Sequence, residues 1–260
     1  MLMKGKKGLI VGVANKRSIA WAIAQRCAEQ GAQCAFSFQS ERLGENVKEL
    51  TNDLPGSLLF QMDVSDDLQV QKGFDYLRES WSGIDFLVHA VAYAPRQALE
   101  GDFVSTTRED FRTALDISTY SLPVLAHAAK PLMTQGGSIV ALTYLGSERV
   151  MPNYNVMGVA KAALEAAVRY LANDLGPEAI RVNAISPGPM KTLAGAAIGG
   201  ARKTYKHTEQ NAPMRSNATL EAVGGTAVYL ISDAGACTTG EIIRVDGGYH
   251  VLGMPQSENI

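Results

Sequence analysis

The chain has 260 residues, of which 46% are hydrophobic and 19% charged, as expected of a globular protein with a substantial core. Lys and Arg (24) nearly balance Asp and Glu (26), so the chain lacks the basic excess typical of nucleic-acid binding. No apolar run approaches the ~20 residues that a membrane span needs, so we expect no membrane association.

The cysteines and histidines also limit the kinds of site that the chain can form. Cys27, Cys34 and Cys237 have neither disulfide nor metal-site spacing and indicate thiols of a reducing cytoplasm. The four histidines are scattered, so we predict no metal site. The apolar run Gly8–Ala14 is too short, and is followed too closely by polar residues, for an export signal, so we expect a cytoplasmic protein.

The first predicted unit is a strand, a glycine turn and a helix. Lys7–Val13 is a continuous apolar run, typical of a strand buried on both faces of a parallel sheet. Gly12 lies in the turn, Ser18 is a candidate helix N-cap, and Gly31 is suited to end the helix. This geometry directs free backbone N–H groups at a pyrophosphate. The usual G-x-G-x-x-G is absent, so the motif is weak and an ordinary β–α turn is the alternative interpretation.

The second strand, Gln33–Phe38, ends where dinucleotide-binding folds meet the adenosine ribose. Gln39 is neutral and suited to hydrogen-bond ribose hydroxyls. Glu41 would repel the 2′-phosphate of NADPH, whereas Arg42 would attract it. We therefore expect NADH rather than NADPH, with a helix over residues 41–52 following.

The third strand, Ser57–Met62, is followed by Asp63, which is placed either to accept from the adenine amino group or to cap the next helix. That helix is expected over Asp66–Trp81 and the fourth strand over Ile84–Ala90. Small residues at 91–95 would let a ligand approach the backbone at the end of this strand.

A long helical tract from about Thr107 to Met133 comes next. Pro123 and Pro131 lie within it and predict a bend or an end rather than a smooth helix. Gly136 and Gly137 then open the fifth strand, whose apolar part is Ser138–Leu142.

The stretch Tyr144–Lys161 carries the candidate chemistry. Pro152 predicts the first turn of a helix, on which Tyr154 and Lys161 are seven residues apart and so differ by only ~20° around the axis. An ammonium beside a phenol favours the phenolate and would lower the pKa of the tyrosine, which suits an acid catalyst. Half-buried ring packing and a solvated lysine are the alternative interpretation.

After this helix, residues 190–211 are rich in Ala, Gly and Lys and fit either a substrate lid or a pair of ordinary short helices. The tail from Gly253 is expected to be frayed. The other predicted elements are a strand over Ile180–Ile185, a sharp turn over Ser186–Pro189, a helix over Thr219–Ser232 and a strand over Glu241–Val245.

Seven strands that alternate with helices predict a single α/β domain over residues 1–260: a doubly wound (Rossmann) seven-stranded parallel sheet with helices on both faces. Ligands of such sheets bind outside the carboxyl ends of the strands. The candidate ligand residues all follow strands and should meet at that edge: Gly12, Gln39, Asp63, Val91, Tyr144 and residues 187–192.

Nearly the whole chain resembles the short-chain dehydrogenase/reductase superfamily and, within it, the bacterial NADH-dependent enoyl-[acyl-carrier-protein] reductases. Most members of the superfamily have the tyrosine four residues before the lysine, a position that Met157 occupies here. The Tyr-x6-Lys spacing of Tyr154 and Lys161, with Tyr144 upstream, is specific to the enoyl reductases. The other matching motifs are Gly12-Val13-Ala14, Ser18-Ile19-Ala20, residues 144–146 and 152–158, residues 181–186, and Val245-Asp246-Gly247-Gly248.

The resemblance implies hydride transfer from NADH to C3 of a trans-2-enoyl thioester carried on acyl carrier protein, in type II fatty acid elongation, by a homotetramer. It implies catalytic roles for Tyr144, Tyr154 and Lys161 and substrate contacts from Ala94, Tyr144 and Tyr154. It also implies cofactor contacts from Gly12, Ser18, Ile19, Gln39, Asp63, Val64, Val91, Lys161, Met190, Lys191, Thr192, Leu193 and Ala194.

Some positions depart from the pattern or leave the function open. Residues 90–93 read AVAY where many relatives have a serine and a glycine, so Ala92 is expected to crowd aryl-ether inhibitors of the family. A carbonyl reductase or alcohol dehydrogenase of the same superfamily is the nearest rival, and a non-catalytic cofactor-sensing or scaffold protein is another. Four basic residues of the 190–211 segment fit either docking of the acidic carrier protein or plain solvation: Lys191, Arg202, Lys203 and Lys206.

Overall fold

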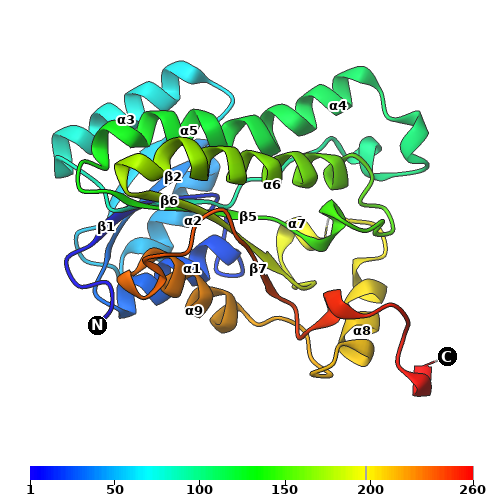
Figure 1. The fold of residues 1–260 in the computed structure, drawn as a ribbon. Coiled ribbons are helices and arrows are strands. Elements are labelled where there is room, and N and C mark those ends of the chain that lie inside the picture. The colour runs from blue at the N-terminus through cyan, green and yellow to red at the C-terminus, as the bar shows by residue number, and fades with distance from the viewer. Residues whose placement is uncertain (197, 260) are drawn as a thin grey trace.

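The computed structural model describes residues 1–196 and 198–259, and these form a seven-stranded, fully parallel sheet with helices on both faces (Figure 1). The strand order is β3-β2-β1-β4-β5-β6-β7, which confirms the predicted doubly wound architecture. The strands are β1 (Lys7–Val11), β2 (Gln33–Phe38), β3 (Leu58–Gln61), β4 (Phe86–His89), β5 (Gly137–Leu142), β6 (Ile180–Pro187) and β7 (Ile242–Val245).

Successive side chains of each strand enter different layers, as the period of two requires. Leu9 of β1 joins the core on one face of the sheet and Ile10 joins the core on the other. Helices α3 (Asp67–Trp81), α5 (Ser121–Ala129) and α6 (Val156–Leu175) cover the first face. Helices α1 (Ile19–Glu29), α2 (Glu41–Thr51) and α9 (Leu220–Ile231) cover the second. Both faces of the strands are therefore buried, which explains their continuous apolar sequences.

The tract predicted over residues 107–133 is helical from Arg108 to Leu132 but changes its helix type along its length. Helix α4 (Arg108–Leu115) passes into a π-helical turn, Asp116–Tyr120, before α5 begins. Pro123 lies in the first turn of α5, where its missing N–H and its ring disturb the hydrogen bonds of the preceding turn. The helical tract was predicted, and Pro131 lies in the short turn that ends it, but the π-helical turn was not predicted.

Two other predictions were wrong. Pro152 does not begin a helix: α6 starts at Val156, and the preceding turn includes Asn153 and Asn155, both with positive φ. Over residues 253–259 the tail is not frayed, because Gln256 hydrogen-bonds through its backbone and side chain to Asn211. Polar side chains near a chain end give no local sign of such distant partners.

The 190–211 segment contains α7 (Leu193–Ala196) and α8 (Ala201–Asn211), which lie beyond the end of the sheet together with the C-terminal tail (Figure 1). Asn217 donates to the Tyr205 carbonyl (3.0 Å) and helps to fix α8. The segment is thus a pair of short helices placed where a substrate lid would lie.

Candidate active site

The turn after β1 is built around Gly12, whose φ is 106°. A Cβ atom at this position would collide with the Ala90 carbonyl, so only glycine lets the ends of β1 and β4 approach so closely. Ser18 does not cap α1 with its side chain; its Oγ accepts from the N–H groups of Ala14 and Asn15, both at 3.1 Å. Its hydroxyl hydrogen and the N–H of Ile19 at the start of α1 remain suited to a phosphate.

Gln39 and Asp63 lie side by side at the ends of β2 and β3. The amide of Gln39 donates to the Asp63 carboxylate at 2.9 Å, and Ser65 donates to the same carboxylate through its N–H and hydroxyl. Burial alone would raise the pKa of Asp63, but these hydrogen bonds lower it overall. Asp66, not Asp63, caps α3. The structure thus contradicts the capping alternative for Asp63.

Tyr154 is held in a strained turn rather than on the helix. Asn153 (φ 58°) and Asn155 (φ 41°) flank it, and their side chains donate to the carbonyls of Gly199 and Gly101. Side chains other than glycine pay an energetic penalty at such φ values, which is typical of functional sites. Tyr154 therefore precedes α6, which starts at Val156, and its side chain is oriented by this turn and not by helical periodicity.

The two tyrosines pack edge to face, with ring centroids 5.0 Å apart and an interplanar angle of 72°. The Tyr154 ring lies directly against Gly146, where any Cβ would strike it. Burial raises the pKa of both phenols, with a further contribution from Tyr144 and Glu165 at Tyr154. The predicted lowering by Lys161 was therefore wrong in direction, because desolvation dominates. Both hydroxyls are protonated at neutral pH and are donors.

Lys161 lies in the second turn of α6 and is 4% exposed. Its Nζ donates to the Leu142 carbonyl at 2.7 Å, which leaves two N–H donors for a ligand. Desolvation lowers its pKa to about 8, against an opposing effect of Glu165. The alternative of a solvated lysine is contradicted by this burial.

An apolar cluster surrounds the tyrosine pair. Leu99, Tyr154 and Met157 are buried in it, and Ala94 and Tyr144 pack against them. Met151 and Ile198 also contact the cluster, so the 190–211 segment reaches the tyrosines. The predicted substrate residues Ala94, Tyr144 and Tyr154 therefore lie together in one apolar cluster.

The predicted cofactor residues of the 190–194 segment are only partly engaged. Met190 packs against the core, and the Thr192 hydroxyl accepts from the Gly195 N–H at 3.0 Å. Leu193 is exposed, and Lys191 lies over the Tyr205 ring at 4.6 Å. The side chain of Ala194 lies outside the described part of the structure. Val64 and Val91 are half-buried and pack against the core on the other face of the sheet from Met190.

Comparison with known proteins identifies the family. The sequence model described as Enoyl-(Acyl carrier protein) reductase matches residues 12–250. This chain belongs to the enoyl-[acyl-carrier-protein] reductase family.

Individual relatives cover almost the full chain. An enoyl-[acyl-carrier-protein] reductase [NADH] of Nostoc sp. is 50% identical over 97% of this chain and 99% of its own. The crystal structure of the Anaplasma phagocytophilum reductase in complex with NAD is 50% identical, with a TM-score of 0.95 and 98% of each chain covered. The Bacillus cereus reductase, solved with NADP+ and indole naphthyridinone, is 48% identical, with a TM-score of 0.96 and 97% of this chain and 99% of its own covered.

Three residues near the site of this family member were not predicted. Glu165, four residues after Lys161, is buried and accepts from the hydroxyls of Thr143 and Ser147. His89 at the end of β4 is fully buried, and Tyr249 beyond β7 raises the pKa of Tyr144. The i,i+4 spacing could have found Glu165, but His89 and Tyr249 depend on the folded topology.

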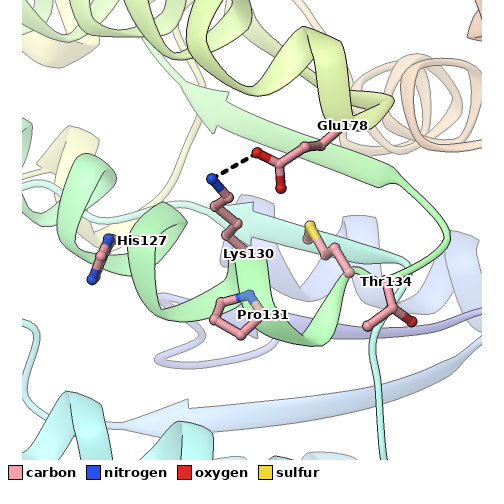
Figure 2. Close-up of a pocket in the computed structure, with 6 residues that line it drawn as sticks. His127, Lys130, Pro131, Thr134 and Glu178 are labelled. Carbon is pink, nitrogen blue, oxygen red and sulfur yellow. Dashed lines mark ion pairs between the residues drawn. The ribbon is translucent and has the colours of Figure 1, made fainter.

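A hollow lies at the amino edge of the sheet, which is opposite to the edge with the tyrosine site (Figure 2). Lys130 and Glu178 form an ion pair across it at 2.6 Å. None of the predicted site residues lines it, so it is separate from the tyrosine site. Within the described part of the chain, no group of His, Cys, Asp and Glu could hold a metal, and no described helix could cross a membrane.

Proposed function

We infer that this protein is an NADH-dependent enoyl-[acyl-carrier-protein] reductase, an oxidoreductase that acts on the C2–C3 bond of trans-2-enoyl thioesters in type II fatty acid synthesis. The observation that supports the inference is the burial of Tyr154 and Lys161 together with the edge-to-face packing of Tyr144 on Tyr154. Met157 occupies the position four residues before the lysine. A carbonyl reductase of the superfamily would need its tyrosine at position 157.

Bound NADH would supply the hydride that adds to C3 of the substrate. Negative charge would then develop on the thioester oxygen as an enolate, and Tyr154 would donate a hydrogen bond to that atom. Protonation of C2 follows and completes the reduction. Because the pKa of this phenol is raised, it is a donor throughout the neutral pH range. A positioned donor in a site shielded from water contributes about 3 kcal/mol of transition-state stabilisation.

Lys161 binds the nicotinamide ribose through the two N–H groups that Leu142 leaves free. The apolar cluster around Leu99 and Met157 holds the first carbons of the acyl chain and excludes water from the reacting atoms. Tyr144 lines the same pocket and supports the Tyr154 ring by edge-to-face packing.

The remaining cofactor contacts follow the strand ends. Gln39 and Asp63 hold the adenosine, and the neutral Gln39 favours NADH over NADPH. The turn at Gly12 and the start of α1 hold the pyrophosphate. The full set proposed to bind the cofactor is Gly12, Ser18, Ile19, Gln39, Asp63, Val64, Val91, Lys161, Met190, Lys191, Thr192, Leu193 and Ala194.

The substrate arrives on acyl carrier protein, and we assign its docking to the basic residues of the 190–211 lid, where Arg202, Lys203 and Lys206 are exposed on α8. The protein works as a cytoplasmic homotetramer, as the resemblance to the family implies. Light scattering after gel filtration tests the tetramer, and a monomeric mass would contradict it.

The decisive experiment follows NADH oxidation by its absorbance. We expect turnover with crotonyl-CoA and NADH, much slower turnover with NADPH, and none with acetoacetyl-CoA. Reduction of acetoacetyl-CoA alone would make the protein a ketoreductase. Binding of NADH without turnover of crotonyl-CoA or of the carrier-bound enoyl substrate would favour the non-catalytic alternative.

A further inference from the structure

Glu165 is a buried carboxylate that the reaction described above does not use. It lies on α6, one turn after Lys161, and is 5% exposed. Its Oε1 accepts hydrogen bonds from the hydroxyls of Thr143 (2.7 Å) and Ser147 (2.6 Å). Burying a carboxylate is costly unless it is paired and hydrogen-bonded, so its presence beside the site calls for a function.

The two hydroxyl donors belong to the segment that carries the tyrosine site. Thr143 immediately precedes Tyr144, and Ser147 immediately follows Gly146, against which the Tyr154 ring packs. One carboxylate oxygen therefore ties both ends of this segment to α6. Movement of Glu165 would shift the surfaces that orient both tyrosines.

The charges around Lys161 give Glu165 a second role. His89 approaches from β4; its Nε2 is 2.7 Å from the Ser121 hydroxyl, and burial lowers its pKa to about 3, so it is neutral. Tyr144 and Tyr154 are neutral as well, because burial raises their pKa values.

The other acidic side chains nearby are paired elsewhere: Glu148 with Arg244, and Asp246 with His250. Glu165 is the acidic group that acts on Lys161, since the two side chains are neighbours at i and i+4 on one helix.

We propose that Glu165 is a positioning residue of this active site, which holds the Thr143–Ser147 segment and places a negative charge one helical turn from the Lys161 ammonium that binds the nucleotide. This proposal rests on the proposed function, because it takes Lys161 to be a ligand of NADH.

The proposal predicts the direction of a pH effect. Desolvation lowers the pKa of Lys161 to about 8, and the negative charge of Glu165 opposes that lowering. Removing the charge lets the pKa fall further. The ammonium is then lost at lower pH, and NADH affinity falls at lower pH with it.

Glu165→Gln tests this, because the amide oxygen still accepts from both hydroxyls while the charge is gone. The dissociation constant of NADH is measured by fluorescence titration between roughly pH 6 and pH 9.5, without any turnover. We expect the wild-type affinity to fall with a midpoint near the Lys161 pKa. In Glu165→Gln the midpoint should lie about one unit lower, so that binding is roughly fivefold weaker than in the wild type at the wild-type midpoint and little changed at about pH 6.

Three variants separate charge from structure. The double variant Thr143→Val, Ser147→Ala keeps the charge, so its turnover should fall while the midpoint stays in place. Lys161→Met should bind NADH weakly with a flat profile, and adding Glu165→Gln to it should cause no further shift. If Glu165→Gln does not fold, Glu165→Met has a similar volume and should show the same lowered midpoint.

Equal midpoints in the wild type and in the Glu165 variants would overturn the proposal, as would a wild-type profile in Lys161→Met. If the wild type reduces crotonyl-CoA but the midpoints coincide, only the role of Glu165 fails. If the wild type does not bind NADH at any pH, the proposed function fails and the role of Glu165 fails with it.

Discussion

The two halves of the carboxyl edge of the sheet are built in opposite ways. At the ends of β1–β3, the groups proposed to hold the adenosine and pyrophosphate are accessible: Gly12 and Gln39 are exposed, and Asp63 is half-buried. At the ends of β4–β6, Tyr154 is 7% exposed and Lys161 is 4% exposed. In the first half the polar groups are accessible to solvent, whereas in the second half they are buried.

This difference decides what each half can do. Water competes for exposed hydrogen-bonding groups, so each contributes modestly to binding and its loss is partly replaced. Buried groups have shifted pKa values and fixed orientations, which chemistry requires, and their removal also disturbs the fold. We therefore expect substitutions in the tyrosine half to change turnover and those in the adenosine half to change nucleotide affinity.

Tyr154→Phe should give the largest effect. It removes one hydroxyl and keeps the ring against Gly146, so the fold and the NADH affinity should be retained. Loss of the donor to the developing negative charge should lower kcat about 100- to 1,000-fold. Steady-state kinetics with crotonyl-CoA and a parallel NADH titration measure the two quantities. A kcat within a few-fold of wild type would show that Tyr154 is not the donor.

Gly146→Ala should have the next largest effect, because the new Cβ would occupy the position of the Tyr154 ring. We expect the free energy of unfolding to fall by about 1–3 kcal/mol and kcat to fall about tenfold as the ring is displaced. Thermal unfolding and steady-state kinetics check both. The matched control is Gly225→Ala in α9, where the new methyl group would have no atom within 4 Å apart from those of its chain neighbours and of its own helix backbone. Stability should therefore be equal or higher and kcat should not change. Equal kcat in Gly146→Ala and wild type would contradict the role of this contact.

The fold was predictable because the strands supply apolar residues to both cores. Continuous apolar runs such as Gln33–Phe38 indicated strands buried on both faces, and the alternation with helices indicated a parallel sheet. The end of β1 was placed two residues too late because Val13 is buried in the second core although it lies beyond Gly12. Apolarity reports burial, and burial continues past the last ladder hydrogen bond.

The geometry of the candidate site could not be predicted from the sequence, and the roles of its residues stay a prediction. The Tyr154–Lys161 spacing was interpreted as two positions on one helix, whereas a strained turn that contains Tyr154 precedes α6. The pKa of Tyr154 is raised because Tyr144 and Gly146 help to bury its ring. Neither residue lies at a helical spacing from Tyr154, so helical periodicity could not predict the direction of the pKa shift. Neutral His89 and the partners of Glu165 come from other strands and loops, so no local pattern could assign them.

Gln39→Ala sharpens the comparison from the adenosine half. The Gln39 amide, which hydrogen-bonds to Asp63, is exposed to solvent. One hydrogen bond from such a group to the adenosine is worth about 1 kcal/mol, so losing it should weaken NADH affinity only about fivefold. The kcat at saturating NADH should not change, because the reacting atoms are at the other half. Gln71→Ala, which removes an exposed amide on α3, is the control and should alter neither quantity. A large loss of kcat in Gln39→Ala would show that the two halves are coupled more tightly than this division implies.

The smallest effect is expected from the lid surface. Arg202→Glu reverses one exposed charge on α8, and exposed ion pairs contribute roughly 0.2–1 kcal/mol, so KM for the carrier-bound enoyl substrate should rise only a few-fold. Added salt should reduce the difference between variant and wild type, because it screens surface charges. KM for crotonyl-CoA, which lacks the acidic carrier protein, should stay the same, and Lys72→Glu on the distant α3 should leave both constants unchanged. An equal rise in KM for both substrates would assign Arg202 to the acyl pocket, whereas no rise for the carrier-bound substrate would leave the lid charges merely solvated.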